Sequence, residues 1–235
     1  MKRQGNCKGG INKLNIEFLL KMNEYAYDSV RNKYCLGMTE KDIEQIIVSS
    51  YRKMAGNDFS FCGDIIGGIR SADIEGPAGD YILKPGDTLI LDLQPQIDGV
   101  FCDTTRTFFI GEPSDDAKKV YRLVKDTLLQ LEKVLKPNIC TDYIYDCMQR
   151  SLRSNGFNCP HHAGHIIGKN REIDPEFLPD ISENIKIGTL AALEPGIYEK
   201  DKYGIRLENN YIVTDDGCKN LFNYTLDIED FIIKV

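Results

Sequence analysis

The sequence lacks the features that mark several classes of protein. It has no long cluster of lysine and arginine, no CxxC pair among its eight cysteines, and no apolar run near the roughly 20 residues of a membrane span. Its formal net charge of -7 argues against nucleic acid or an anionic membrane as the main partner. The scattered cysteines favour reduced thiols, and we expect no export signal. We therefore expect a cytoplasmic globular protein whose ligands are cations and small substrates.

The segment around Asp98-Gly99 carries the clearest local signal. Two apolar, β-branched runs flank this dipeptide, which predicts a β-hairpin. A two-residue turn places Asp92 opposite Thr105 and Asp103 opposite Gln94, so the two aspartates share one face as diagonal neighbours. Isolated acidic residues are usually solvated, but Asp92 lies inside an apolar run, where an unpaired carboxylate is costly. We therefore expect a cation or a hydrogen-bond donor beside Asp92.

Helical patterns precede the hairpin. Residues 11–34 have the apolar spacing of an amphipathic helix, with the predicted buried face formed by Ile11, Leu14, Phe18, Met22 and Tyr25. Thr39 and Asp42 resemble a capping box and predict the start of a second helix. A loop-rich segment, 56–86, then leads into the hairpin.

The same order follows the hairpin. Ser114 predicts a third helix that ends before Pro137, and Thr141 predicts the cap of a fourth helix, with Gly156 after its end. Residues 186–214 then hold two strand-like runs with a turn-rich middle. Helix, helix and hairpin thus occur twice.

The two hairpins also resemble each other in sequence. KPGDTL, at 84–89, leads to Asp92, and KIGTL, at 186–190, leads to Glu194. This self-similarity suggests an internal duplication, with a chance match as the alternative. We expect one α+β domain, 1–235, built from two halves at about 11–112 and 113–235. Two such halves could bring Asp92 and Asp103 towards Glu194 and Glu208.

Four carboxylates at one site would repel one another, and divalent metal would remove that repulsion. Oxygen ligands with one imidazole suit manganese, iron, cobalt or zinc, and bridging carboxylates can hold two ions about 3.5–4 Å apart. The sequence has three histidines, all between 161 and 165. His165 is the predicted imidazole ligand.

At this point the chain resembles the pita-bread metallopeptidases, which include methionine aminopeptidase, Xaa-Pro aminopeptidase, prolidase and the related creatinase. The resemblance covers nearly the whole chain and is carried by LDLQPQIDGVFCDTTRTF (91–108), HHAGHIIG (161–168), LEPGIY (193–198) and GIRLENNYIVTDDG (204–217). It implies two pseudo-symmetric halves around a curved antiparallel sheet. It also implies five metal ligands, with Asp103 and Glu208 at the bridging positions: Asp92, Asp103, His165, Glu194 and Glu208.

Other residues point to one branch of the family. Thr-Arg-Thr after Thr104, together with Tyr198 and Arg206, is more similar to Xaa-Pro aminopeptidase and prolidase than to methionine aminopeptidase. The resemblance implies that Tyr198 and Arg206 lie near Asp92, although a plain salt bridge within the sheet would also explain Arg206. It places His161 on the substrate side, whereas we predict a structural role for His162.

The chain departs from the family pattern at two positions. A substrate-binding histidine before the first hairpin corresponds to Glu75, and a second active-site histidine, seven residues after the metal histidine, corresponds to Glu172. An imidazole can donate a hydrogen bond, whereas an ionised carboxylate can only accept one. We also expect no counterpart of the separate N-terminal domain that many Xaa-Pro aminopeptidases carry.

The resemblance implies a dinuclear metallohydrolase of the Xaa-Pro aminopeptidase or dipeptidase type, in which a metal-bridging hydroxide attacks a carbonyl. Glu194 is then both a ligand and a proton shuttle, and His161 is the second predicted catalytic residue. We expect two divalent ions, with manganese or cobalt favoured over zinc or iron, and a small peptide or amide as substrate. A creatinase-like hydrolase of a non-peptide C–N compound and a non-catalytic binding module are the alternatives. A homodimer is left open.

Overall fold

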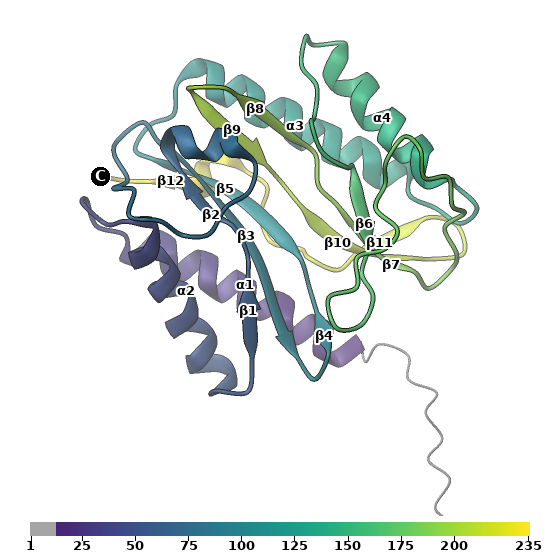
Figure 1. The fold of residues 1–235 in the computed structure, drawn as a ribbon, viewed down its shortest axis with the longest axis horizontal. Coiled ribbons are helices and arrows are strands. Elements are labelled where there is room, and N and C mark those ends of the chain that lie inside the picture. Colours follow the sequence, from purple (N-terminus) through teal and green to yellow (C-terminus); the bar gives the residue numbers. More distant parts are fainter. Residues whose placement is uncertain (1–12) are drawn as a thin grey trace, which may run out of the picture.

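The computed structural model describes residues 13–235 as a mixture of helices and mainly antiparallel sheets (Figure 1). This architecture confirms the predicted α+β class. The helices are α1 (Lys13–Lys33), α2 (Glu40–Ala55), α3 (Asp115–Val134), α4 (Thr141–Arg153) and the 3-10 helices η1 (Gly68–Asp73) and η2 (Ile228–Phe231). The strands up to the first hairpin are β1 (Ser60–Cys62), β2 (Ile65–Gly67), β3 (Thr88–Ile97), β4 (Val100–Phe101) and β5 (Thr104–Ile110). Those that follow are β6 (Gly164–Ile166), β7 (Leu190–Leu193), β8 (Gly196–Glu199), β9 (Tyr203–Arg206), β10 (Asn209–Val213), β11 (Cys218–Asn220) and β12 (Ile232–Ile233).

The first hairpin has the register that its turn predicts. β3 pairs with β5 so that Asp92 faces Thr105. Asp98 and Gly99 have φ angles of 51° and 75°, and positive φ at both central residues is what a tight two-residue hairpin turn requires. Asp103, however, lies between β4 and β5 and forms no strand pair, whereas Gln94 pairs with Cys62 of β1. The hairpin therefore presents Asp103 from a break in the strand.

The second hairpin is interrupted in the middle of both of its strands. β7 pairs with β10 and β8 pairs with β9 in one continuous register. Leu193 faces Asn209 and Gly196 faces Arg206, which leaves Glu194 and Glu208 opposite each other between the two ladders. Pro195 has no backbone N–H and so cannot continue the ladder. Each of the two predicted strand-like runs is for this reason divided into two short strands.

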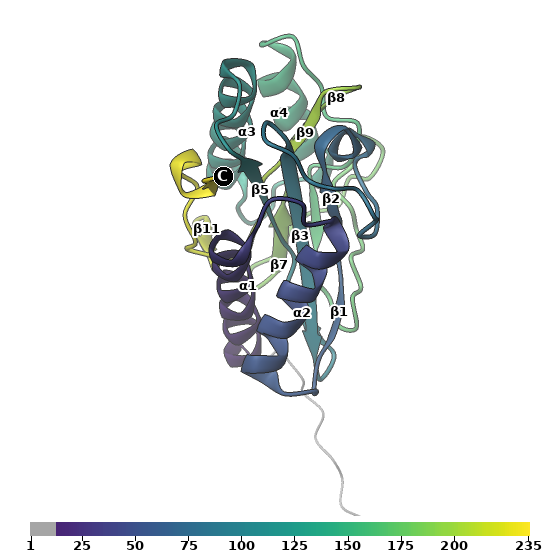
Figure 2. The same ribbon diagram turned by 90° about the vertical axis from the view of Figure 1, so that its left-hand side faces the viewer.

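Each hairpin has its own pair of helices (Figure 1). α1 packs against α2 and β3, and α3 packs against α4 and β9. Figure 2 shows α1 and α3 on the same side of the strands. The sheet of the first half is closed by β12, which pairs in parallel with β5.

The predicted buried face of the first helix is wrong. Met22 is buried as expected, but Phe18 is exposed and Tyr25 is only half buried. Ile11 and the side chain of Leu14 lie outside the part of the chain that the structure describes. The face against the sheet is instead formed by Ile16, Leu19, Met22, Asn23, Ala26, Tyr27 and Val30. A polar residue, Asn23, belongs to it because its amide donates to Leu93 O at 2.9 Å and Thr104 Oγ1 at 2.8 Å.

The predicted helix starts agree with the structure in two places and differ in one. Thr39 and Asp42 form the capping box, and the Ser114 hydroxyl accepts a bond from Ala117 N at 3.1 Å. Thr141 is not a cap but the first residue of α4, and its hydroxyl donates to Ile181 O at 2.5 Å. The loop-rich segment 56–86 also contains β1, β2 and η1.

A seam of hydrogen bonds joins the two halves at β5. Glu208 N donates to Thr105 O at 3.1 Å, and the Thr107 hydroxyl donates to Arg206 O at 2.8 Å. Arg106 is fully buried, and its guanidinium donates to Glu208 O at 2.7 Å and Asn209 Oδ1 at 2.8 Å.

Within residues 13–235, no helix combines the length and apolar character needed to cross a membrane.

Candidate metal centre

Asp92, in β3, lines a cavity. The cationic side chain of Arg206 lies beside it, which agrees with the expectation that a carboxylate in an apolar run has a charged or donating partner. Arg206 of β9 donates from Nη2 to Asp92 Oδ2 at 2.8 Å, and the same nitrogen lies 3.1 Å from Asp64 Oδ2. Burial, and then the charge of Asp92, raise the pKa of Asp64 to about 6, although Arg206 opposes this shift. One buried guanidinium is thus shared by two carboxylates.

Asp103 and Glu208 each present a buried carboxylate oxygen without a hydrogen-bond partner. Asp103 is 4% exposed and Glu208 is 1% exposed, and the unpaired atoms are Asp103 Oδ1 and Glu208 Oε1. The other Glu208 oxygen, Oε2, accepts a bond from the Thr105 hydroxyl at 2.9 Å. Because buried carboxylate oxygens are normally paired, these two atoms indicate a place for a cation.

His165 of β6 faces this pair. Its Nε2 lies 3.4 Å from Asp103 Oδ2 and 3.7 Å from both Glu194 Oε1 and Glu208 Oε1. The other ring nitrogen, Nδ1, lies 3.1 Å from Ile166 O. Since a carbonyl oxygen can only accept, Nδ1 carries the proton in the neutral ring and the Nε2 lone pair points at the carboxylates. This is the orientation in which a backbone carbonyl holds a metal-binding histidine.

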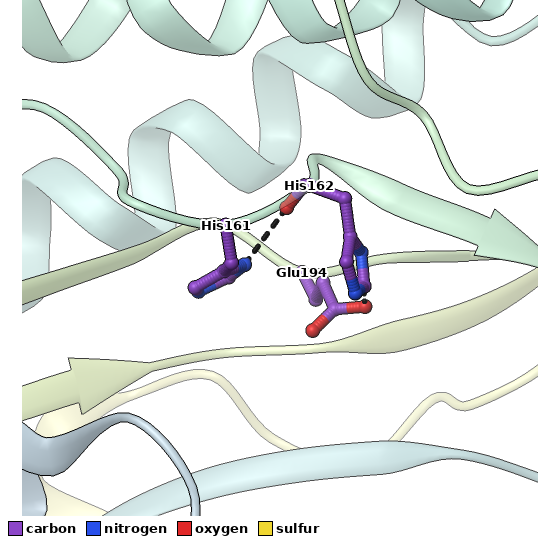
Figure 3. A group of neighbouring side chains, drawn as sticks. All are labelled: His161, His162 and Glu194. Carbon is purple, nitrogen blue, oxygen red and sulfur yellow. Dashed lines mark hydrogen bonds and ion pairs between the residues drawn. The ribbon is translucent and has the colours of Figure 1, made fainter. Parts of the chain in front are cut away.

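Glu194 directly follows β7 and lies between two histidines. Figure 3 shows its carboxylate pointing towards His162, whose Nδ1 lies 3.1 Å from Glu194 Oε1. Burial opposes ionisation of Glu194, but the neighbouring His162 and His165 outweigh it and lower the pKa of Glu194 to about 2. Glu194 is therefore an anion at neutral pH.

The remaining carboxylates have the opposite tendency. Burial, and then the charges of Asp92 and Glu194, raise the pKa of Asp103 well above its usual value. Burial, Asp103 and Glu194 do the same for Glu208. A divalent ion among these oxygens would remove both causes, so the donor set fits one or two hard or borderline cations. Asp103, His165 and Glu208 offer three donor atoms within 4.8 Å of one another.

A second hydrogen-bond chain leads from Asp92 to His161. Arg206 Nη1 donates to the Tyr198 hydroxyl at 3.0 Å, and that hydroxyl lies 2.8 Å from His161 Nε2. His161 Nδ1 lies 2.8 Å from His162 O, so Nδ1 carries the proton and Nε2 accepts from Tyr198. Burial lowers the pKa of His161 to about 4, so this imidazole is neutral at physiological pH.

Most of these residues, but not Tyr198 or Glu208, line a cavity of about 450 Å³. Of the two glutamates that replace family histidines, Glu75 lines this cavity, whereas Glu172 is exposed and does not. Glu176, four residues further on, lines it instead. The chain between His165 and Glu176 folds back so that these two residues form a β-bridge, which counting from the motif does not reveal.

Sequence reasoning missed three residues of this site. His162 contacts Glu194 rather than serving the structure alone, and its place in the run His161-His162 next to a predicted ligand was the available signal. Asp64 had no signal, because its contact with Arg206 joins segments 142 positions apart. Thr105 was predicted to face Asp92, but its bond to Glu208 depends on how the two hairpins dock.

Comparison with known proteins gives one family. A sequence model of metallopeptidase family M24 matches residues 16–215. An uncharacterised peptidase of Staphylococcus aureus (strain MW2) is 27% identical over 190 residues, which are 80% of this chain and 54% of that protein. The chain thus spans about half the length of the curated relatives that it matches.

Solved structures show the same fold. An X-Pro aminopeptidase from Thermotoga maritima MSB8 has a TM-score of 0.88 and 26% identity, covering 97% of this chain and 64% of that one. A dipeptidase from Mycobacterium ulcerans has a TM-score of 0.89 at 20% identity, covering 98% and 62%. A prolidase from Pyrococcus furiosus has a TM-score of 0.86 at 22% identity, covering 92% and 65%. The predicted pita-bread fold is confirmed.

Proposed function

Because the chain belongs to metallopeptidase family M24, we propose that it is a metal-dependent aminopeptidase or dipeptidase of the Xaa-Pro type. The observation that carries this proposal is the convergence of Asp103, Glu208 and His165 on one point, with two buried carboxylate oxygens unpaired there. Asp92 and Glu194 border the same cavity. The similarity to an X-Pro aminopeptidase supports the Xaa-Pro specificity.

We assign the metal-binding role to Asp92, Asp103, His165, Glu194 and Glu208. Bound there, two divalent ions such as manganese or cobalt would lower the pKa of a water molecule and polarise a substrate carbonyl. Glu194 is ionised and so carries no proton of its own, and we assign it the transfer of a proton from such a water to the leaving nitrogen.

His161, Tyr198 and Arg206 would orient the substrate. The His161 Nε2 atom accepts a bond from Tyr198, and a substrate N–H group in the cavity would compete for the same lone pair. Arg206 fixes both Tyr198 and Asp92, so it couples the position of this hydroxyl to that of a proposed ligand. We assign these residues to holding and orienting the substrate by hydrogen bonds, with no covalent bond to it.

A metal analysis combined with a substrate panel tests the proposal. The purified protein, loaded with manganese or cobalt, should contain up to two ions per chain and hydrolyse Xaa-Pro dipeptides or longer Xaa-Pro peptides. Asp103→Ala and Glu208→Ala should lose turnover and one ion, because each removes a bridging oxygen. Glu183→Ala, an exposed carboxylate outside the cavity, is the matched control.

The outcomes separate the alternatives. Bound metal with hydrolysis of small amides but not of peptides would favour a creatinase-like activity. No bound metal and no hydrolysis would favour a binding module, and undiminished turnover of a one-ion variant would contradict the dinuclear mechanism.

A further inference from the structure

Besides Asp64, which pairs with Arg206, two carboxylates at the cavity have no part in the proposed metal centre. Glu75 follows η1 in the first half of the chain, and Glu176 follows β6 in the second half, yet both line the cavity. Glu75 is exposed and Glu176 is half buried. Within residues 13–235, neither carboxylate forms a salt bridge to a lysine or an arginine. Both are therefore available to a ligand.

The other carboxylates of the cavity each have a proposed or observed cation beside them. Two divalent ions would neutralise the four carboxylates that we assign as ligands: Asp92, Asp103, Glu194 and Glu208. Arg206 forms an ion pair with Asp64. Of the three histidines, His161 is neutral at physiological pH, and His162 and His165 contact Glu194. Glu75 and Glu176 are then the two carboxylates of the cavity that neither a proposed ion nor Arg206 compensates. Arg206 is the one lysine or arginine that lines the cavity.

The backbone on both sides of Glu75 is fixed. Arg206 Nη1 donates to Ile74 O at 2.8 Å, and Gly76 N donates to Asp64 Oδ1 at 3.0 Å. Glu75 N itself donates to Asp73 O at 2.9 Å across Ile74, whose φ of 74° and ψ of -56° form a tight γ-turn. Glu75 therefore projects from a segment that the buried charges of the site hold in place.

Glu176 is held in a similar way. Ile166 N donates to Pro175 O at 3.1 Å, and Phe177 N donates to Gly164 O at 2.7 Å, so both neighbours of Glu176 are bonded to β6. The strand that carries His165 thus also sets the position of this second carboxylate. Fixed positions reduce the entropy that is lost when a carboxylate binds a ligand.

We propose that the preferred substrates carry an additional ammonium or guanidinium group, as in a lysyl or arginyl side chain, and that Glu75 and Glu176 bind it. This inference rests on the proposed function, since it concerns the substrate of the same cavity. Two carboxylates that line one cavity from fixed backbone positions, and that have no lysine or arginine partner among the described residues, attract a cation. It would repel a substrate group of negative charge.

The test compares substrates that differ only in that charge. For the manganese-loaded protein, kcat/KM is measured for lysyl-proline and norleucyl-proline, and for arginyl-proline and citrullyl-proline. We expect the charged member of each pair to be favoured about tenfold, since exposed ion pairs contribute up to about fivefold each. The preference should decrease from 50 to about 500 mM salt, because screening acts on partly exposed charges.

Four single variants and one double variant locate the charge. Glu75→Gln and Glu176→Gln should each lower the lysyl to norleucyl ratio of kcat/KM about threefold, and the double variant should bring it close to one. Glu183→Gln, outside the cavity, is the control and should not change the ratio. Glu172→Gln tests the residue that sequence counting selected, and a fall in the ratio for this variant would overturn the assignment to Glu176.

A binding measurement separates this inference from the proposed function. Calorimetry with lysinamide and norleucinamide reports charge recognition without turnover. If no peptide is cleaved but lysinamide binds more tightly in a way that depends on Glu75, the function is wrong and the charge preference holds. If both peptides are cleaved equally and the amides bind equally, the charge preference is wrong and the function holds.

Discussion

Replacement of Thr105 by valine should weaken metal binding although Thr105 itself would touch no ion. Valine keeps the shape and the β-branch but removes the hydroxyl that donates to Glu208 Oε2 at 2.9 Å. That bond turns the other oxygen, Oε1, towards His165 Nε2, which lies 3.7 Å away. Without it the carboxylate can rotate, so a bridging ligand loses its fixed orientation.

The size of the effect follows from this indirect role. Loss of a hydrogen bond that orients a metal ligand typically costs a factor of about 10–100 in metal affinity, which is about 1.4–2.7 kcal/mol. We expect a loss in this range for the weaker of two ions. Calorimetric titration of the metal-free protein with manganese measures it.

Thr107→Val is the matched control. Thr107 lies on the same face of β5 and is equally buried, and its hydroxyl donates to a backbone atom, Arg206 O, at 2.8 Å. Both variants should lower the free energy of unfolding by about 1–2 kcal/mol, because each removed hydroxyl donates one buried hydrogen bond and accepts another from Arg206. Only Thr105→Val should change metal affinity. Equal metal affinities for the two variants would refute the orienting role of Thr105.

Three further predictions concern stability. Manganese at about 100 times its dissociation constant should raise the free energy of unfolding by about 2.7 kcal/mol, measured by thermal melting. An unchanged melting temperature would contradict a metal site. Glu40→Ala should cost about 3 kcal/mol in urea unfolding, with the exposed Gln45→Ala as control, because the buried Glu40 carboxylate accepts bonds from Gly67 N and Gly79 N at 2.7 Å. In the metal-free protein, His161 takes up a proton at about pH 6.5 when unfolded but only at about pH 4 when folded. The free energy of unfolding should therefore decrease as the pH falls through that window, and it should decrease less steeply for His161→Gln than for the wild type. An unchanged dependence on pH in the variant would show that His161 is not the group responsible.

Local signals allowed much of the fold to be predicted. The Asp98-Gly99 turn determines the hairpin register by itself, because a two-residue loop permits one pairing. The caps at Thr39 and Ser114 involve side chains and backbone atoms three residues apart, so the sequence contains all the partners. Features of this kind are independent of how the halves dock.

The errors have a different origin. The buried face of α1 was misjudged because Asn23, a polar residue, packs inwards to bind the hairpin backbone 70 positions away. Glu176 rather than Glu172 lines the cavity because the chain after His165 folds back on β6. Asp64 shares Arg206 with Asp92 only in the folded molecule. Each of these depends on contacts between distant segments, which spacing along the chain does not encode.

The seam between the halves gives a bound ion a role in chain topology. Residues of the two hairpins that meet there, such as Asp92 and Arg206, are 114 positions apart. An ion held by carboxylates of both hairpins closes a chain loop of this order, much as a disulfide would, and so restricts the unfolded chain as well as filling the folded site. We expect loss of such an ion to loosen the seam before it loosens the hydrophobic core, to which both halves contribute.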